Sequence, residues 1–377
     1  MRTLVLSALL LAPTLLGCTE ASTDEDGGAD LAGIDQKGDA VPGIDVQARL
    51  RPGTGVDATI TTALPRPGYV FYAAEGTKVT LEVTHGGSTA GLDTLIKVYG
   101  PRLADGTYPK TVASDEDSGY GKLSRVKDLA ISIPGFYLVE VTSGAASAPV
   151  TSAKAHLALS CTGTCDSDQP VQPFGLELRW YQRSAERRAL SLQSYASAGA
   201  HVAARVAAGV PTSWGVVMDI DETTLNNSAY QHSRTELGTG YSPASWTDWV
   251  NKKAATPLDG ALAFTQKVKQ LGGKVVFVTN RMAGTECPQT EINLQTAGFT
   301  YDQILCRPQG LPSDKNPRFD QVKMGMEVVA FVGDNILDFP ALNQTIRTQP
   351  DAAFAAFGES YFIIPNPMYG SFEANPN

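Results

Sequence analysis

The chain has 377 residues, more than one ordinary hydrophobic core accommodates, and this length predicts two to three domains. Hydrophobic residues make up 42% of the chain and charged residues 18%, a composition that excludes wholesale disorder. The net charge of -9 argues against a nucleic-acid partner bound through its phosphates, and most of it falls in the segment 19–45, which has eight acidic residues and one lysine.

Residues 1–17 have the pattern of a lipoprotein signal peptide. Arg2 precedes a mostly apolar run, residues 4–16, which is too short to span a bilayer. The run ends Leu15-Leu16-Gly17-Cys18, which resembles a bacterial lipobox. That resemblance implies cleavage before Cys18 and lipidation of this residue; an ordinary signal peptide with a stray cysteine is the alternative. Because Thr19 rather than aspartate follows, we expect an exported lipoprotein of the outer membrane.

Residues 18–45 are expected to form an acidic, disordered tether. The segment is rich in Gly, Ser, Thr and Asp and holds too few apolar residues to build a core. No later apolar run reaches 18 residues, so contact with a membrane is expected through the lipid anchor alone.

Four further cysteines fit an oxidising compartment: Cys161, Cys165, Cys287 and Cys306. Their even number favours disulfides. The first two enclose a short loop and could close locally, and the last two flank one predicted helix–loop–strand unit. A zinc site is disfavoured, because the four histidines are scattered along the chain.

Residues 46–165 are predicted to form an all-β sandwich that serves as an accessory domain. Short alternating runs are separated by Gly and Pro turns, which is typical of such sandwiches. The clearest predicted strands are residues 70–73, 78–84, 94–99, 129–133 and 135–142.

This region also resembles the bacterial pre-peptidase C-terminal domain. The resemblance rests on Asp93-Thr-Leu-Ile-Lys-Val-Tyr-Gly-Pro101, Ser114-Asp-Glu-Asp-Ser-Gly119 and Pro134-Gly-Phe-Tyr-Leu-Val-Glu-Val141. It implies a non-catalytic module. Asp115 and Asp117 could bind calcium, although an exposed acidic turn is the favoured interpretation.

Residues 166–175 are predicted to be a linker, and residues 176–377 a second, α/β domain. A helix is expected over 176–208, and apolar strands then alternate with helices, which favours a doubly wound, mainly parallel sheet. The predicted strands are 216–218, 275–278, 304–305, 328–332 and 362–364, with helices over 260–271, 286–296 and 317–325. Ligands of such sheets bind beyond the carboxyl ends of the strands.

Polar clusters follow three of these strands, and a fourth lies between two of them. They are Asp219-Ile-Asp-Glu-Thr223, Thr279-Asn-Arg281, Ser313-Asp-Lys-Asn-Pro-Arg318 and Gly333-Asp-Asn-Ile-Leu-Asp338. A lone Asp-x-Asp arises by chance, but four polar clusters at one edge of a sheet rarely do. The sequence therefore predicts an active site at this edge.

From Trp180 onward the chain resembles a haloacid-dehalogenase-type (HAD) phosphatase of the class C acid phosphatase group, many of which are lipoproteins. Besides the four clusters, the resemblance rests on Trp180-Tyr-Gln-Arg-Ser-Ala-Glu186 and Pro365-Asn-Pro-Met-Tyr-Gly-Ser-Phe-Glu373. It implies a Rossmann-like domain with phosphomonoesterase activity. Two departures are Phe372, where tryptophan is common, and Cys306-Arg307, where a Leu-Lys pair is frequent.

Phosphate-ester hydrolysis requires a positioned nucleophile and charge stabilisation. We expect Asp219 to attack phosphorus, forming an aspartyl-phosphate, and Asp221 to act as general acid and base. Carboxylates beside a phosphate dianion require a cation, and Mg²⁺ suits oxygen ligands. The expected metal residues are Asp219, Asp221 through its carbonyl, Asp334 and the supporting Asp338. The expected phosphoryl-binding residues are Thr279, Asn280 and Lys315.

The stretch 224–257 is too long for a plain connection and is expected to form a small helical cap. Selectivity would come from this cap and the C-terminal segment. The resemblance implies that aromatic residues stack on a nucleobase, with Tyr369 and Phe372 facing Trp246 or Tyr230. We therefore expect hydrolysis of nucleoside 5′-monophosphates and of simple aryl phosphates. The alternative is that Tyr369 and Phe372 only pack the C-terminal tail onto the core.

Three other functions are compatible with parts of the sequence. A phosphotransferase would use the same aspartyl-phosphate and differ in its acceptor. A non-catalytic surface-binding lipoprotein would act through the sandwich, but it needs none of the four polar clusters. A metal-dependent glycosyltransferase would explain Asp-x-Asp but not the Gly-Asp-Asn-x-x-Asp cluster. The partners expected are a small phosphate monoester and the membrane, not nucleic acid, and the sequence carries no signal for an oligomeric state.

Overall fold

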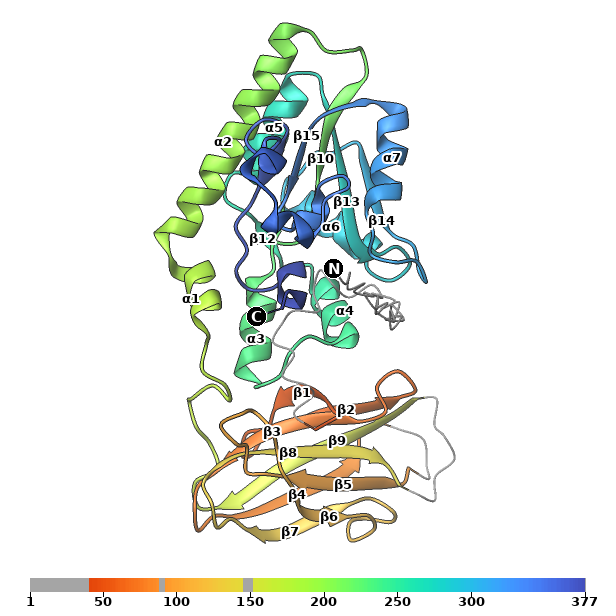
Figure 1. Ribbon diagram of the computed structural model, residues 1–377. Coiled ribbons are helices and arrows are strands. Elements are labelled where there is room, and N and C mark those ends of the chain that lie inside the picture. Colours follow the sequence, from red (N-terminus) through yellow and green to blue (C-terminus); the bar gives the residue numbers. More distant parts are fainter. Residues whose placement is uncertain (1–40, 88–91, 145–151, 377) are drawn as a thin grey trace, which may run out of the picture.

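A computed structural model describes residues 41–87, 92–144 and 152–376 (Figure 1). The predicted signal peptide, Cys18 and the tether up to residue 40 lie outside the described residues. Within the described ranges, no helix combines the length and the apolar character needed to cross a membrane.

The N-terminal domain is a sandwich of two sheets, as predicted. The first sheet has the order β1-β3-β8-β5-β6, and the second has the order β2-β9-β4-β7. Neighbouring strands are antiparallel, except that β1 and β3 are parallel. The strands are β1 (Asp45–Arg49), β2 (Gly55–Thr61), β3 (Pro67–Ala73), β4 (Lys78–His85), β5 (Thr94–Tyr99), β6 (Thr111–Asp115), β7 (Arg125–Ala130), β8 (Gly135–Ser143) and β9 (Ser152–Thr162).

Alternating side chains of the two sheets build the sandwich core. In β4, Val79, Leu81 and Val83 are fully buried in one hydrophobic cluster, while the residues between them face outward. Strand β7 differs from the prediction, because it begins at Arg125 and ends at Ala130 rather than covering 129–133. The alternation is broken by Asp128, whose φ of 52° and the register shift opposite it mark an irregularity in the ladder.

The second domain contains a five-stranded parallel sheet with the order β14-β13-β10-β15-β16. The first strand in the chain is therefore central, and later strands add on both sides of it, which confirms the predicted doubly wound class. The strands are β10 (Trp214–Met218), β13 (Lys274–Met282), β14 (Gln303–Arg307), β15 (Glu327–Gly333) and β16 (Tyr361–Ile363).

Both faces of this sheet are covered. Val216 and Met218 point into one hydrophobic cluster with α2 and α5, whereas Val217, between them, points into a second cluster with α7. The helices are α1 (Leu176–Arg183), α2 (Ala185–Ala208), α5 (Ala261–Gln270), α6 (Cys287–Thr296) and α7 (Asn316–Gly325), with the 3₁₀ turns η1 (Ile336–Asp338), η2 (Gln344–Thr348), η3 (Asp351–Phe354) and η4 (Ser371–Ala374).

The single helix predicted over 176–208 is two helices. Ser184 adopts an extended conformation (φ -82°, ψ 141°), ends α1 and begins α2. Its side chain accepts a hydrogen bond from the Arg187 backbone N–H at 3.0 Å, which is the usual reason for a serine to start a helix. Apolar periodicity alone does not reveal such a break.

The stretch 224–257 folds as the predicted helical cap, with α3 (Ser228–Glu236) and α4 (Pro243–Lys252) between the short paired strands β11 (Leu225–Asn226) and β12 (Thr256–Pro257). The cap lies between the parallel sheet and the sandwich (Figure 1). Arg234 of α3 donates to the Val46 carbonyl of β1 at 2.8 Å and pairs with Asp45 at 3.3 Å. The sandwich thus contacts the cap directly.

The four described cysteines form two disulfides, Cys161–Cys165 and Cys287–Cys306. The first closes a turn after β9, and the second joins the start of α6 to β14. Disulfides were predicted for these cysteines, and the structure confirms them.

Candidate active site

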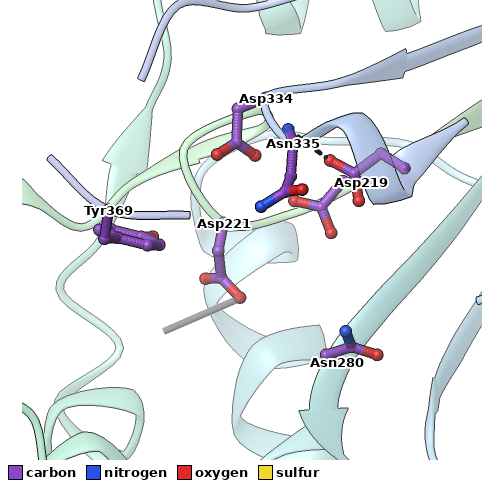
Figure 2. A pocket seen from close by; sticks show the side chains of 7 residues that line it. Asp219, Asp221, Asn280, Asp334, Asn335 and Tyr369 are labelled. Carbon is purple, nitrogen blue, oxygen red and sulfur yellow. Dashed lines mark hydrogen bonds between the residues drawn. The ribbon is translucent and has the colours of Figure 1, made fainter. Parts of the chain in front are cut away.

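The polar clusters meet at the carboxyl edge of the parallel sheet. Asp219 follows β10 and Asp334 follows β15, and the Asp219 backbone N–H donates to the Val332 carbonyl at 2.9 Å, which ties the two strand ends together. Carboxylate oxygens of Asp219, Asp334 and Asp338 lie within 4.8 Å of one another. A pocket opens here (Figure 2), lined by Asp219, Asp221, Asn280, Asp334, Asn335, Asp338 and Tyr369.

The loop after β15 holds Asp338 against the strand end. The Asn335 backbone N–H donates to Asp338 Oδ2 at 2.9 Å, and η1 returns the chain toward the sheet. A β-carbon on Gly333 would lie 2.2 Å from the Asp338 β-carbon, so only glycine allows this close approach. The Gly-Asp-Asn-x-x-Asp spacing therefore brings Asp334 and Asp338 to one side of the pocket.

Lys315 supplies a positive charge among these carboxylates. It lies at the start of α7, its side chain is 2% exposed, and Nζ is 2.5 Å from both Asp219 Oδ1 and Asp338 Oδ1. A buried ammonium in this position is oriented by the two carboxylates it neutralises. A phosphoryl oxygen bound beside Asp219 would therefore lie next to this ammonium group.

Burial, together with the neighbouring negative charge, raises the pKa of two carboxyl groups. Burial raises the pKa of Asp219 well above its ordinary value; Lys315 opposes this shift, and the Asp338 and Asp334 carboxylates add to it. Burial and the Asp338 carboxylate likewise raise the pKa of Asp334, although Asn366 donates to its Oδ2 at 2.9 Å. One lysine does not balance three carboxylates, so the cluster favours binding of a further cation.

Three oxygen-bearing side chains this close together form a donor set for a hard divalent cation. Asp219, Asp334 and Asp338 fit that requirement, with Asp338 also tied to Lys315. The Asp221 side chain is not part of this cluster.

Asp221 points into the pocket from the other side, and Arg281 holds it. Arg281 Nη2 and Nε lie 2.7 and 3.0 Å from Asp221 Oδ1, and Asn227 Nδ2 lies 2.9 Å from the same oxygen. The Asp221 side chain remains 14% exposed, compared with 1% for Arg281. The carboxylate is thus accessible from the pocket but fixed from behind.

Of the predicted phosphoryl-binding residues Thr279 and Asn280, one is buried and the other lines the pocket. Asn280 lines the pocket, whereas Thr279 is fully buried and its hydroxyl accepts from the Arg281 backbone N–H at 3.2 Å. Arg318 organises both: Nη1 donates to the Thr279 carbonyl and Nη2 to Asn280 Oδ1, each at 2.5 Å. Arg318 therefore orients the Asn280 amide at the pocket wall.

The four aromatic residues expected to contact substrate do not meet in one place. Tyr369 lines the pocket, on the opposite side from Asn280 in Figure 2, and its hydroxyl donates to the buried Glu222 carboxylate. Phe372 is 42% exposed and lies in a separate cleft between the two domains. Trp246 and Tyr230 are each 2% exposed and pack edge-to-face in the cap core, 5.2 Å apart between ring centroids. Neither presents a free ring face to the pocket.

Four residues of the site were not singled out from the sequence: Glu222, Asn227, Arg281 and Arg318. All four lie within or beside the quoted polar clusters, so their presence was visible. Several of their partners, however, come from distant segments, as Tyr369 does for Glu222. Burial and the Asp221 carboxylate raise the pKa of Glu222, and no local pattern reveals that environment.

Comparison with known families gives the decisive observation. Residues 152–372 match the family described as HAD superfamily, subfamily IIIB (Acid phosphatase). The chain belongs to this subfamily. Membership in subfamily IIIB confirms the family predicted from the polar clusters and agrees with the site geometry.

Several proteins are similar to this subfamily IIIB chain. The stem 31 kDa glycoprotein of Glycine max is 29% identical over 161 residues, which cover 41% of this chain and 58% of the glycoprotein. The chain thus spans less than two thirds of that relative. The class C acid phosphatase from Bacillus anthracis is 30% identical, covering 53% of this chain and 88% of that one, with a TM-score of 0.48. The pre-peptidase C-terminal domain of collagenase from Bacillus anthracis is 13% identical, covering 31% and 97%, with a TM-score of 0.24.

Proposed function

We propose that this protein is a Mg²⁺-dependent phosphomonoesterase that works through an aspartyl-phosphate on Asp219. One observation carries the proposal: Asp219, Asp334 and Asp338 converge around Lys315 in a pocket at the carboxyl edge of a parallel sheet. Membership in an acid phosphatase subfamily supports it. No other described group of acidic, histidine or cysteine side chains has metal-binding geometry.

The residues of the pocket divide the reaction between them. A carboxylate oxygen of Asp219 attacks phosphorus. A new oxygen–phosphorus bond forms, and the bond from phosphorus to the leaving oxygen breaks. Asp221 gives its proton to that oxygen, then removes a proton from the water that hydrolyses the aspartyl-phosphate. Lys315 and Asn280 stabilise the phosphoryl oxygens, and the net products are an alcohol and inorganic phosphate.

Mg²⁺ would be held by Asp219, the Asp221 carbonyl and Asp334, with Asp338 supporting them. When bound, it would neutralise charge between the carboxylates and the phosphoryl group. Without it, Lys315 is the cation that pairs with Asp219 and Asp338, and burial together with Asp338 and Asp334 raises the pKa of Asp219. A bound cation would oppose this shift and favour the ionised carboxylate that attacks.

The proposed substrates are nucleoside 5′-monophosphates and other small phosphate monoesters. Support from the aromatic residues is limited to Tyr369, which lines the pocket with 3% of its surface exposed. Trp246 and Tyr230 give no support, because both are buried in the cap core.

The test is a hydrolysis assay with aryl, alkyl and nucleoside phosphates, after removal of metal with EDTA and after addition of Mg²⁺. We expect activity that EDTA abolishes and Mg²⁺ restores. Undiminished activity in EDTA would overturn the Mg²⁺ dependence, and no activity on any monoester would overturn the proposed function.

We further propose that Cys18 carries a lipid that anchors the protein, which fits the predicted signal peptide and tether. Cys18→Ser should eliminate metabolic labelling with fatty acid and release the protein from the membrane fraction. Equal labelling of the variant and the native protein would contradict the anchor.

A further inference from the structure

We propose that Arg281 is a positioning residue that presents one chosen oxygen of Asp221, Oδ2, to the substrate. This inference rests on the proposed function, because it assigns the atom that carries the proton in that reaction. Arg281 is not a member of the cluster formed by Asp219, Asp334 and Asp338. Because its side chain is buried, it does not contact the substrate.

The two oxygens of Asp221 have unequal surroundings. Oδ1 accepts from Arg281 Nη2 at 2.7 Å, from Arg281 Nε at 3.0 Å and from Asn227 Nδ2 at 2.9 Å. Within the described part of the chain, Oδ2 has a single long contact, 3.3 Å from Arg281 Nε. Because a carboxylate oxygen offers about two lone pairs, these donors occupy Oδ1, and Oδ2 is the oxygen left to face the substrate.

Arg281 is itself fixed from several directions. Nη1 donates to Thr290 Oγ1 at 3.0 Å, and Nη2 also lies 3.2 Å from Asn227 Oδ1. The guanidinium lies over the Trp246 ring, 5.4 Å from its centroid, and the side chain is 1% exposed. Trp246, expected from the sequence to contact substrate, instead supports the residue that orients Asp221.

Asn227 completes this arrangement. Its Oδ1 accepts from Trp249 Nε1 at 2.9 Å and from Arg281, so its Nδ2 faces the acceptors, with Asp221 Oδ1 at 2.9 Å and Glu222 Oε2 at 3.4 Å. A planar guanidinium with a fixed fork can hold a carboxylate in one rotation, whereas the single ammonium of lysine cannot. The shape of the Arg281 guanidinium, and not only its charge, therefore determines which oxygen of Asp221 faces the substrate.

Substrates with different leaving groups distinguish the positioning of Asp221 by Arg281 from a purely structural role of Arg281. An alkyl phosphate needs a proton on its leaving oxygen, but dinitrophenyl phosphate does not. Arg281→Met should lower kcat/KM for an alkyl phosphate by about 100-fold or more, and for dinitrophenyl phosphate by less than about tenfold. Arg281→Lys should fall between the native protein and Arg281→Met for the alkyl ester. An equal loss on both esters would overturn the inference.

A double-variant cycle gives a second readout. In an Asp221→Asn background, Arg281→Met should cause no further loss on the alkyl phosphate, because the group that Arg281 positions is already absent. Additive losses would overturn the inference. If Arg281→Met does not fold, Arg281→Lys completes the same cycle.

Two controls keep the outcomes distinct. Arg205→Met removes an arginine–carboxylate pair, with Glu327, at the opposite end of β15 and should leave both esters unaffected. Inactivity of the native protein on every monoester would refute the proposed function. If the native protein is active and Arg281→Met loses the same activity on the alkyl and the dinitrophenyl ester, only the role of Arg281 is refuted.

Discussion

Asp219 is the residue on which hydrolysis depends most directly. Asp219→Asn should abolish turnover, because an amide does not attack phosphorus and the metal cluster loses one carboxylate. Steady-state hydrolysis with protein freed of contaminating phosphatase measures the effect. Asp320→Asn, at an exposed site on α7, is the matched control and should retain native activity. A near-native rate for Asp219→Asn would refute the mechanism.

Asp221 should behave differently from Asp219. Asp221→Asn keeps the backbone carbonyl proposed for the metal but loses the proton-carrying oxygen. Its kcat on alkyl phosphates should fall by about 10²–10⁴-fold, the usual contribution of general acid–base catalysis. Mg²⁺ binding, followed by calorimetry, should change little. Loss of Mg²⁺ binding in this variant would show that the carboxylate itself is a ligand.

Tyr369 and Glu222 link the C-terminal segment to the nucleophile loop. Tyr369→Phe removes the hydroxyl that donates to the buried Glu222 carboxylate, and should lower the free energy of unfolding by about 1–3 kcal/mol. Chemical denaturation measures this change. Tyr120→Phe, whose ring is exposed, should have no effect. An unchanged stability for Tyr369→Phe would contradict a structural role for this hydrogen bond.

At the residue scale, the sequence predicted which side chains gather at the sheet edge but not how each is held. Asp219, Asp334 and Lys315 follow strands or precede a helix, and parallel topology alone brings such positions together. The contacts of Arg281 with Asp221 and Trp246 depend on the packing of the cap, which no local pattern specifies.

At the scale of elements, the Cys287–Cys306 disulfide fixes α6 against β14. Replacing both cysteines with serine should lower the free energy of unfolding by about 2–4 kcal/mol, through the greater freedom of the unfolded chain. Urea denaturation under non-reducing conditions measures the loss. The Cys161–Cys165 disulfide closes a shorter loop, so replacing both of its cysteines should cost less. A loss below about 0.5 kcal/mol for the first pair would contradict this account.

The contact between β1 and α3 makes the sandwich part of the support for the cap. Asp45→Ala leaves the buried Arg234 guanidinium without its carboxylate and should cost about 1–3 kcal/mol. Arg51→Ala breaks an exposed pair between the sandwich and Asp166 of the linker and should cost less than about 1 kcal/mol. Equal costs, measured by denaturation, would show that the cap does not depend on the sandwich.

Element types were predictable where a single period runs uninterrupted, as in the apolar strands of the parallel sheet. Predictions were wrong where one residue interrupts the period. Ser184 divides one expected helix into two through its capping hydrogen bond, and Asp128 displaces a strand of the sandwich by its positive φ. The first break is a local capping bond and the second is a left-handed backbone conformation, and hydrophobic periodicity carries neither signal.

At the scale of the whole molecule, stability should depend jointly on pH and metal. The raised pKa values of Asp219 and Asp334 mean that the metal-free folded protein holds protons that the unfolded chain has lost above about pH 4. Stability of the metal-free protein should therefore fall as pH rises from about 4 toward neutral. Mg²⁺ competes with these protons, so it should raise the melting temperature more near pH 7 than near pH 5.

Differential scanning fluorimetry across this pH range, with EDTA and with Mg²⁺, tests that coupling. Asp334→Asn should reduce both the pH dependence and the Mg²⁺ effect, because it removes one of the buried carboxyl groups. A Mg²⁺ effect that is equal at both pH values would contradict proton–metal competition at the cluster.

The central claim is that the Asp219 carboxylate attacks phosphorus, and trapping the covalent intermediate tests it most directly. A protein beginning at Val41, which keeps the described contacts of β1, is mixed with phosphate-labelled substrate and Mg²⁺ and quenched rapidly in acid. We expect label bound to the native protein at Asp219, located by peptide mapping, and none on Asp219→Asn. Label on another residue, or turnover by Asp219→Asn at the native rate, would contradict it.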